Sequence, residues 1–225
     1  AGDYRRYLQQ DGLDAVTNYE AYKGLFSSHN DANYFEIAYT LRRQFGHYGL
    51  CQGRNLYSFA DNHDVDRLAS RLTNPAHLYP VYCLLFTMPG APSIYYGSEF
   101  GLAGTKNPSD DWPLRPALDL AAHAHPPQPD LPAAIRRLAA LRRACPALAH
   151  GDYRELALSH RRLVFSRRCP EQWLVIAVSA EQKPTSQDLR LPDAPDGTLV
   201  DLLNPGQSFP LKNGRAQLAP LWPGW

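Results

Sequence analysis

The apolar positions in the first part of the chain alternate between strand-like and helix-like spacing. The segments 13–20, 55–59 and 93–96 are short and rich in β-permissive residues, with turn-forming residues beside them. Between them, apolar residues recur at helical spacing over 30–46, and 78–88 is apolar nearly all round, as in a helix buried on several sides. This order predicts parallel strands joined by crossover helices, an α/β fold.

A change of pattern separates the rest of the chain from this region. A proline-rich stretch, 113–132, leads into an amphipathic helix for which Asp130 is the expected N-cap and Pro146 the stop. Beyond it, short strand candidates follow one another between turn-like breaks, and no helical period returns. We therefore expect an α/β unit over 1–150 and a small all-β unit, a sandwich, over 151–225.

Composition and charge exclude some classes of partner. The chain has 225 residues, 44% of them hydrophobic, and a formal net charge of +1. This charge gives no general electrostatic reason to expect a nucleic acid or an acidic membrane as partner. Two arginine pairs, 136–137 and 142–143, fall on the polar side of the last predicted helix, where we expect solvent exposure.

The cysteines and the N-terminus bear on the cellular compartment. The four cysteines stand far apart, with no C-x-x-C or Cys/His ligand spacing. That pattern argues against a disulfide framework or a zinc site and favours a reducing compartment, so we expect a cytoplasmic protein. The first ten residues, "AGDYRRYLQQ", contain no apolar segment. The only methionine is Met88, so we expect an upstream part before Ala1.

Unusual polar residues gather where the predicted strands end. Glu20 comes at the end of the first strand, Asn62, His63 and Asp64 follow the second, and Glu99 follows the third. Ligands collect at the carboxyl ends of parallel strands, so this coincidence favours a catalytic mouth. Taken alone, an Asn-His-Asp run is more often a capped turn.

Two stretches carry a resemblance to a known family. "FADNHD" (59–64) resembles the strand-end signature of the alpha-amylase family of glycoside hydrolases, and "PGAPSIYYGSEFGLAG" (89–104) is similar to its eighth barrel strand and the loop that follows. The first motif is weak alone, but the two in register are a strong pair. The resemblance implies that 1–150 is the C-terminal part of a (β/α)8 TIM barrel, about strands six to eight, and that a C-terminal β-domain follows.

The same resemblance assigns roles to the residues at the second strand end. Asp64 matches the third carboxylate of the amylase-type site, a transition-state stabiliser that accepts hydrogen bonds from sugar hydroxyls. His63 would donate to the same sugar, and Asn62 would fix the turn. The family's nucleophilic Asp and general-acid Glu are then expected upstream of Ala1, so that the chain alone lacks the catalytic pair.

Aromatic residues near the predicted mouth offer apolar surfaces for the C–H faces of sugars. Tyr19, Tyr96 and Trp112 fall in or beside its loops. We expect core packing for Tyr96, whereas Trp112 is a candidate for binding substrate.

Several charged residues near the motifs have plainer interpretations. Asp66 and Arg67 are expected to pair locally, Glu99 to form structural hydrogen bonds, and Arg115 to anchor its loop. For Glu20, a structural and a functional role both stay open.

The resemblance implies an α-linked glucan or maltodextrin as substrate and a retaining mechanism, with water or another sugar as acceptor. No cofactor is expected, and we find no cluster of oxygen ligands comparable to a calcium loop. Two alternatives remain. One is a non-catalytic carbohydrate-binding or scaffold half-barrel, and the other is one part of a split enzyme, with the missing N-terminal barrel segment as its partner.

Overall fold

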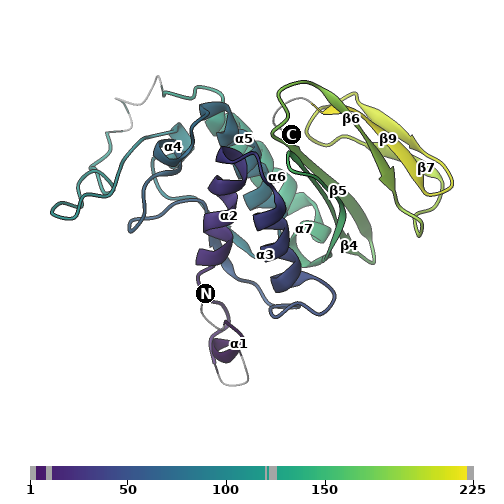
Figure 1. Ribbon diagram of the computed structural model, residues 1–225, viewed down its shortest axis with the longest axis horizontal. Helices are drawn as coiled ribbons and strands as arrows, with labels where there is room; N and C mark the ends of the chain where they lie inside the picture. The colour runs from purple at the N-terminus through teal and green to yellow at the C-terminus, as the bar shows by residue number, and fades with distance from the viewer. Residues whose placement is uncertain (1–3, 9–11, 120, 122–125, 222–225) are drawn as a thin grey trace.

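The computed structural model describes residues 4–8, 12–119, 121 and 126–221. Helices form one side of the molecule, with the short strands β1 and β2 among them, and the antiparallel strands β3 to β9 form the other side (Figure 1). The α-helices are α1 Tyr4–Tyr7, α2 Tyr19–Asn30, α3 Phe35–Phe45, α4 Leu68–Arg71, α5 Leu78–Thr87, α6 Leu131–Ala144 and α7 Pro146–His150, and two 3₁₀ turns are η1 Pro75–His77 and η2 Ser98–Phe100. The strands are β1 Tyr57–Phe59, β2 Ala91–Ser93, β3 Asp152–Leu158, β4 Arg162–Cys169, β5 Gln172–Ser179, β6 Thr185–Arg190, β7 Gly197–Val200, β8 Ser208–Leu211 and β9 Arg215–Leu221.

Parallel strands joined by helices make up the first part, as the sequence predicts. β1 and β2 pair in parallel, with Tyr57 opposite Ala91 and Phe59 opposite Ser93. On its other edge β1 meets an isolated parallel bridge from Thr17 to Tyr57. The chain crosses from β1 to β2 through α4, η1 and the largely apolar helix α5, so both strands end on the same side.

The first predicted strand, 13–20, is wrong apart from that bridge. Asn18 Oδ1 accepts a hydrogen bond from the Ala21 backbone N–H at 3.1 Å and so caps α2, which begins at Tyr19. The Asp31 N–H still bonds back to Ser27 O, so α2 takes the residues expected to open the next helix. α3 consequently begins at Phe35.

The third strand also lies earlier than the predicted 93–96. Ala91 N–H donates to Leu56 O at 2.8 Å, which starts the pairing directly after Gly90. Gly90 has a φ of 107°, a conformation that favours glycine. Tyr95 and Tyr96 therefore lie beyond the end of β2.

Two arginines bind the carboxyl end of α5, and one of them corrects an expectation. Arg142 on α6 donates from Nη1 to Phe86 O at 2.6 Å and from Nη2 to Gly90 O. Arg167 on β4, 1% exposed, donates to Thr87 O at 2.8 Å and to Gly151 O. Helix C-termini leave carbonyls unpaired and carry partial negative charge, which these cations satisfy. Arg142 is therefore partly buried, not a solvated residue.

The N-cap expected for α6 is not seen: Asp130 makes no side-chain capping bond at the start of this helix.

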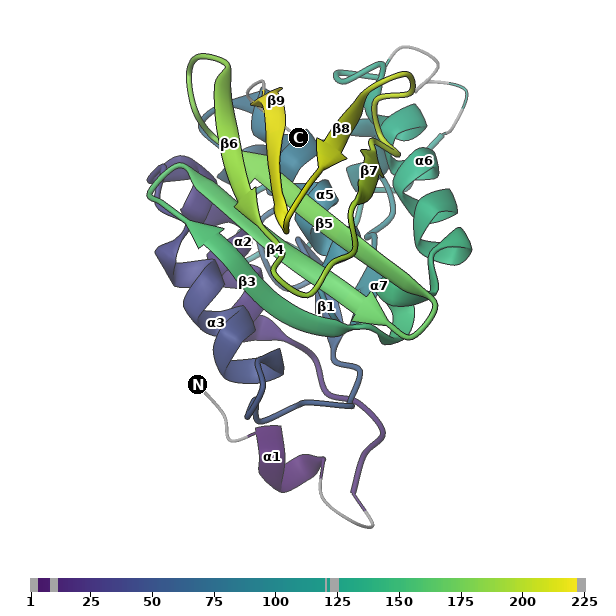
Figure 2. The same cartoon turned by 90° about the vertical axis from the view of Figure 1, so that its right-hand side faces the viewer.

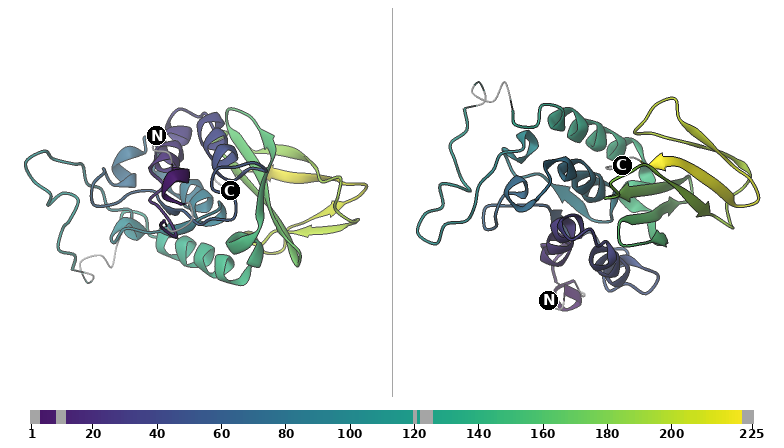
Figure 3. Two further views of the ribbon diagram at one scale, coloured as in Figure 1. Left: turned by 90° about the horizontal axis from the view of Figure 1, so that it is seen from below. Right: turned by 45° about the horizontal axis from the view of Figure 1, so that its top comes forward.

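Residues after 151 form antiparallel strands in two layers (Figures 2 and 3). The sheet β3–β4–β5 lies between the helices and the pairs β6–β9 and β7–β8. Successive residues of β4 face opposite sides, so Leu163 and Phe165 join the helices in the first core and Val164 joins the second. The first core thus draws on both parts of the chain, and the division into units 1–150 and 151–225 stays a prediction.

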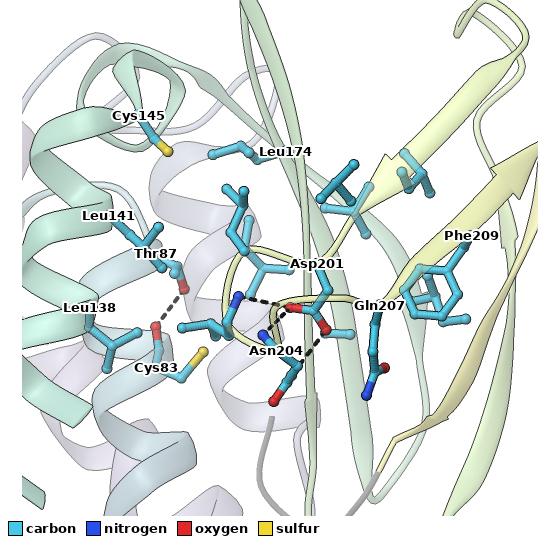
Figure 4. Close-up of a pocket in the computed structure, with 18 of the residues that line it drawn as sticks. Cys83, Thr87, Leu138, Leu141, Cys145, Leu174, Asp201, Asn204, Gln207 and Phe209 are labelled. Carbon is cyan, nitrogen blue, oxygen red and sulfur yellow. Dashed lines mark hydrogen bonds between the residues drawn. The ribbon is translucent and has the colours of Figure 1, made fainter. Parts of the chain in front are cut away.

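A cavity of about 630 Å³ lies between α5, α6, β5 and the segment after β7 (Figure 4). Its walls include Cys83, Leu138 and Leu174, and Asp201 lies between the helices and the strands in this view. The Asp201 carboxylate accepts from the backbone N–H groups of its own turn. None of the candidate site residues lines this cavity.

Two further observations concern the described residues. No helix among them is long and apolar enough to cross a lipid bilayer. The four cysteines are free, and all except the half-buried Cys169 are buried.

Candidate active site at the strand ends

The side chains that follow β1 and β2 meet at one edge of the parallel sheet. The ring centroids of His63, after β1, and Tyr95, after β2, are 6.4 Å apart. This is the clustering that parallel strands predict for residues at their carboxyl ends.

Asn62 forms the turn that presents His63 and Asp64. Its Oδ1 accepts the Asp64 backbone N–H at 2.8 Å, and its Nδ2 donates to the Tyr19 hydroxyl at 3.3 Å. Such a bond to the backbone two residues ahead is a standard asparagine turn. The expectation that Asn62 fixes the turn is confirmed.

The Asp64 carboxylate is open to solvent and flanked by donors. His63 Nε2 lies 3.3 Å from Oδ2 and Arg115 Nη2 lies 3.7 Å from Oδ1, with the Asp64 side chain 51% exposed. Lys106 Nζ donates to the Asp64 backbone carbonyl at 3.1 Å. Arg115 thus contacts the motif itself, beyond the loop-anchoring role expected for it. A carboxylate in this setting can accept hydrogen bonds from an incoming hydroxylated ligand.

A buried polar layer lies beneath the open one. Asp61, 3% exposed, accepts hydrogen bonds from Leu68 N–H at 2.8 Å and Ser98 Oγ at 2.7 Å. Burial raises the pKa of Asp61, while the bonds from Leu68 and Ser98 oppose that rise. Asp61 was not singled out from the sequence, because adjacency to the motif does not reveal burial.

Asp66 and Arg67 do not pair with each other, contrary to expectation. Asp66 accepts from Arg71 Nη1 at 3.3 Å and from the Lys106 backbone N–H at 2.7 Å. Arg67 is fully buried, and its side chain points toward the loop after β2.

The aromatic candidates are exposed. The expectation of core packing for Tyr96 is wrong, since it is 42% exposed and its hydroxyl donates to Pro116 O at 3.0 Å. Tyr19 packs edge-on against Phe59, with ring centroids 5.0 Å apart. Trp112 is 69% exposed and stands three positions before Arg115, the residue that reaches Asp64.

The two glutamates do not join Asp64. Glu20 is held in an ion pair with Arg43, whose Nε lies 3.0 Å from Oε1, a contact within the helices rather than with the strand-end loops. Oε2 of Glu99 is buried and accepts no hydrogen bond from the described residues, so the hydrogen-bonding role expected for Glu99 is not seen at that atom. The part of the chain that the structure describes holds no group of three or more metal-ligating His, Cys, Asp or Glu side chains.

Known proteins resemble this chain in sequence. The family described as alpha amylase, catalytic domain, matches residues 2–149. Cyclomaltodextrin glucanotransferase from Bacillus licheniformis is 30% identical over 147 residues, which are 65% of this chain and 19% of that protein. An enzyme of the same name from Niallia circulans is 29% identical over 147 residues, 65% of this chain and 20% of that protein. The chain thus spans about a fifth of the length of these relatives.

Solved structures resemble it in fold. An Anoxybacillus alpha-amylase superposes with a TM-score of 0.79 at 24% identity, covering 96% of this chain and 47% of that one. The Geobacillus thermoleovorans alpha-amylase in complex with acarbose gives 0.77 at 21% identity, with the same coverage. Together with the catalytic-domain match over well over half of the residues, the shared α/β fold and the Asn-His-Asp strand end lead to one conclusion: the chain belongs to the alpha-amylase family of glycoside hydrolases.

Proposed function

We propose that this chain is the C-terminal part of an alpha-amylase-type glycosidase that acts on α-linked glucans or maltodextrins by a retaining mechanism. The observation that carries the proposal is the open Asp64 carboxylate, flanked by His63 at 3.3 Å and Arg115 at 3.7 Å where the parallel strands end. Relatives named as glucanotransferases and amylases, one of them bound to acarbose, support the substrate class.

Asp64 has an electrostatic role in this proposal. A retaining glycosidase uses a nucleophilic carboxylate and an acid/base carboxyl roughly 5–5.5 Å apart. We expect both upstream of Ala1, as the family resemblance implies. Asp64 then accepts hydrogen bonds from sugar hydroxyls and stabilises positive charge at the anomeric carbon, a kind of contribution worth about 3–4 kcal/mol.

His63 and the exposed aromatic rings bind the sugar in this scheme. A neutral imidazole suffices for His63, because Nε2–H donates to a hydroxyl next to Asp64. Trp112 and Tyr96, both exposed, offer ring faces to the apolar side of the sugar. The acceptor is water in a hydrolase or a second sugar in a transglycosylase, and relatives of both kinds are known.

We also propose a cytoplasmic protein without nucleic-acid or membrane partners. The four free cysteines support a reducing compartment, and the net charge of +1 gives no reason to expect a polyanionic partner. The partner that the proposal does require is the N-terminal segment of the barrel.

The test measures the release of reducing sugar from maltodextrin by three proteins. They are residues 1–225 alone, the complete polypeptide encoded by the gene, and the Asp64→Asn variant of the complete polypeptide. We expect no turnover by 1–225 alone and clear turnover by the complete polypeptide. Asp64→Asn should lower kcat by at least about 10²-fold with a smaller change in KM, because the lost interaction is stronger in the transition state.

Asp193→Asn is the control, since Asp193 is an exposed residue after β6 that pairs only loosely with Arg154 at 3.6 Å. It should leave kcat unchanged. Sugar binding without turnover by the complete polypeptide would support the non-catalytic alternative. Robust turnover by 1–225 alone would place the catalytic pair within this chain and contradict the proposal.

A further inference from the structure

Arg67 is a fully buried guanidinium directly beneath the strand-end loops. It precedes α4, and its exposed fraction is 0%. Burying a charge is costly unless hydrogen bonds and a counter-charge compensate it. The contacts of Arg67 therefore indicate what this arrangement stabilises.

The Arg67 guanidinium joins three loops. Nη1 donates to Tyr96 O at 2.8 Å and to Ser98 Oγ at 3.2 Å, both in the segment after β2. Nη2 donates to Leu114 O at 2.9 Å, in the long loop that follows. The Arg67 backbone N–H donates to Gly104 O at 2.9 Å. Arg67, from the loop after β1, thus binds both the segment that follows β2 and the long loop that contains Leu114.

Charge compensation comes through Ser98. Its hydroxyl accepts from Arg67 and donates to Asp61 Oδ2 at 2.7 Å, which links the buried cation to the buried carboxylate. A planar guanidinium can serve several acceptors in fixed directions, which an ammonium cannot.

Two glycines leave room for this side chain. A Cβ at Gly97 would lie 3.3 Å from Arg67 Nη1, and one at Gly104 would lie 3.1 Å from Arg67 Cδ and 2.2 Å from Pro113 O. Gly97 also has a φ of 86°. At both glycines the backbone therefore passes close to the Arg67 side chain, although Leu102 Cδ1, 2.7 Å from a Cβ at Gly97, is the nearer neighbour there.

Two contacts of Arg67 lead toward groups near His63 and Asp64: its guanidinium lies against the Tyr95 ring, and it donates to the carbonyl of Leu114. Its Cζ lies 4.8 Å from the Tyr95 ring centroid and 5.3 Å from that of Tyr96. The Tyr95 ring is 6.4 Å from His63, and Leu114 directly precedes Arg115, which reaches Asp64 at 3.7 Å.

We propose that Arg67 is a positioning residue of the site: it fixes Tyr95, Tyr96 and Arg115 relative to His63 and Asp64 without touching substrate. This inference rests on the proposed function. Small displacements of groups around reacting atoms lower rates strongly, up to about 10²-fold for about 1 Å. Loss of the guanidinium should therefore lower kcat in enzyme that is still folded.

The test uses Arg67→Lys in the complete polypeptide, with Arg167→Lys as the matched control. Both arginines are buried and donate to backbone carbonyls, but Arg167 binds Thr87 and Gly151, away from the strand ends. We expect both variants to lower the melting temperature. Only Arg67→Lys should also lower kcat, by at least about tenfold, with a smaller change in KM.

Wild-type kcat in folded Arg67→Lys, or an equal loss in Arg167→Lys, would overturn the inference. If Arg67→Lys does not fold, Ser98→Ala decides, because it removes one acceptor of Arg67 and its link to Asp61. A folded Ser98→Ala enzyme with wild-type kcat would then contradict the positioning role. Wild-type enzyme is assayed first, beside Asp64→Asn. If the wild type shows no turnover, the proposed function is overturned and this inference with it. If the wild type is active, the Arg67 variants test the inference separately from the proposed function.

Discussion

At the scale of the residue, burial fixes the protonation of side chains far from the candidate site. His29 on α2 is 1% exposed, with Nδ1 2.7 Å from Leu25 O and Nε2 3.0 Å from the Tyr34 hydroxyl. A carbonyl only accepts, so Nδ1 carries the hydrogen and Nε2 accepts from Tyr34. Desolvation lowers the pKa of His29 from 6.5 to about 3, although the bond to Leu25 O opposes it and His77 lowers it slightly further.

This pKa predicts a dependence of stability on pH. Between about pH 3 and 6.5 the unfolded chain binds a proton at His29 that the folded chain does not. The stabilisation is therefore complete above pH 6.5 and is lost as the pH falls, by up to about 1.4 kcal/mol per pH unit. Urea unfolding at several pH values should show that the free energy of unfolding falls less steeply with falling pH in His29→Gln than in wild type. The exposed His47→Gln should keep the wild-type slope, and equal slopes in all three proteins would refute the assignment.

At the scale of the element, two arginines hold the connection between the end of α5 and the start of β2. Arg142 and Arg167 bind the carbonyls at Phe86, Thr87 and Gly90, and β2 starts at the next residue, Ala91. Because Arg142 comes from α6 and Arg167 from β4, they connect this crossover to both neighbouring layers. Burial lowers the pKa of Arg167 to about 10, so the group stays charged near neutral pH.

Two adjacent arginines on α6 test this connection. Arg142→Met leaves buried carbonyls without donors, which should lower the free energy of unfolding by about 1–3 kcal/mol. Arg143→Met, at an exposed position of the same helix, should change it by less than about 0.5 kcal/mol. Urea unfolding measures both free energies. A loss for Arg142→Met no larger than the loss for Arg143→Met would contradict a stabilising role of the Arg142 bonds.

At the scale of the whole molecule, the parallel sheet is small and partly open. Among the described residues it has two strands and one bridge, and Tyr57 on β1 is 47% exposed. The solved relatives are about twice as long, since this chain covers 47% of each. Unpaired strand edges with exposed aromatic neighbours promote association.

Residues 1–225 prepared alone should therefore self-associate. Sedimentation velocity should give species larger than a monomer at micromolar concentration. Adding the N-terminal barrel segment that the proposed function requires should shift them to a single species containing one copy of each part. A stable monomer of 1–225 that ignores the upstream segment would contradict this prediction.

The sequence by itself determined the α/β class, the crossover from one parallel strand to the next through α5, the helices at α3 and α6, and the family motif. Periodicity and motifs depend on residues close together along the chain, so they can be read before folding is known. The helix α2 was missed because the β-permissive residues before it hid the Asn18 cap.

Only the tertiary structure decided which charged side chains are buried and what they bind. Arg142 and Arg143 are neighbours with the same charge, yet only Arg142 reaches the carbonyls of α5. Arg67 binds the carbonyl of Leu114, far along the loop after β2, and Arg115 from the same loop reaches back to Asp64. In each pair about fifty residues of chain separate the partners. The physical reason is that burial and hydrogen bonding depend on which distant backbone groups the fold brings within about 3 Å, and no local pattern records that distance.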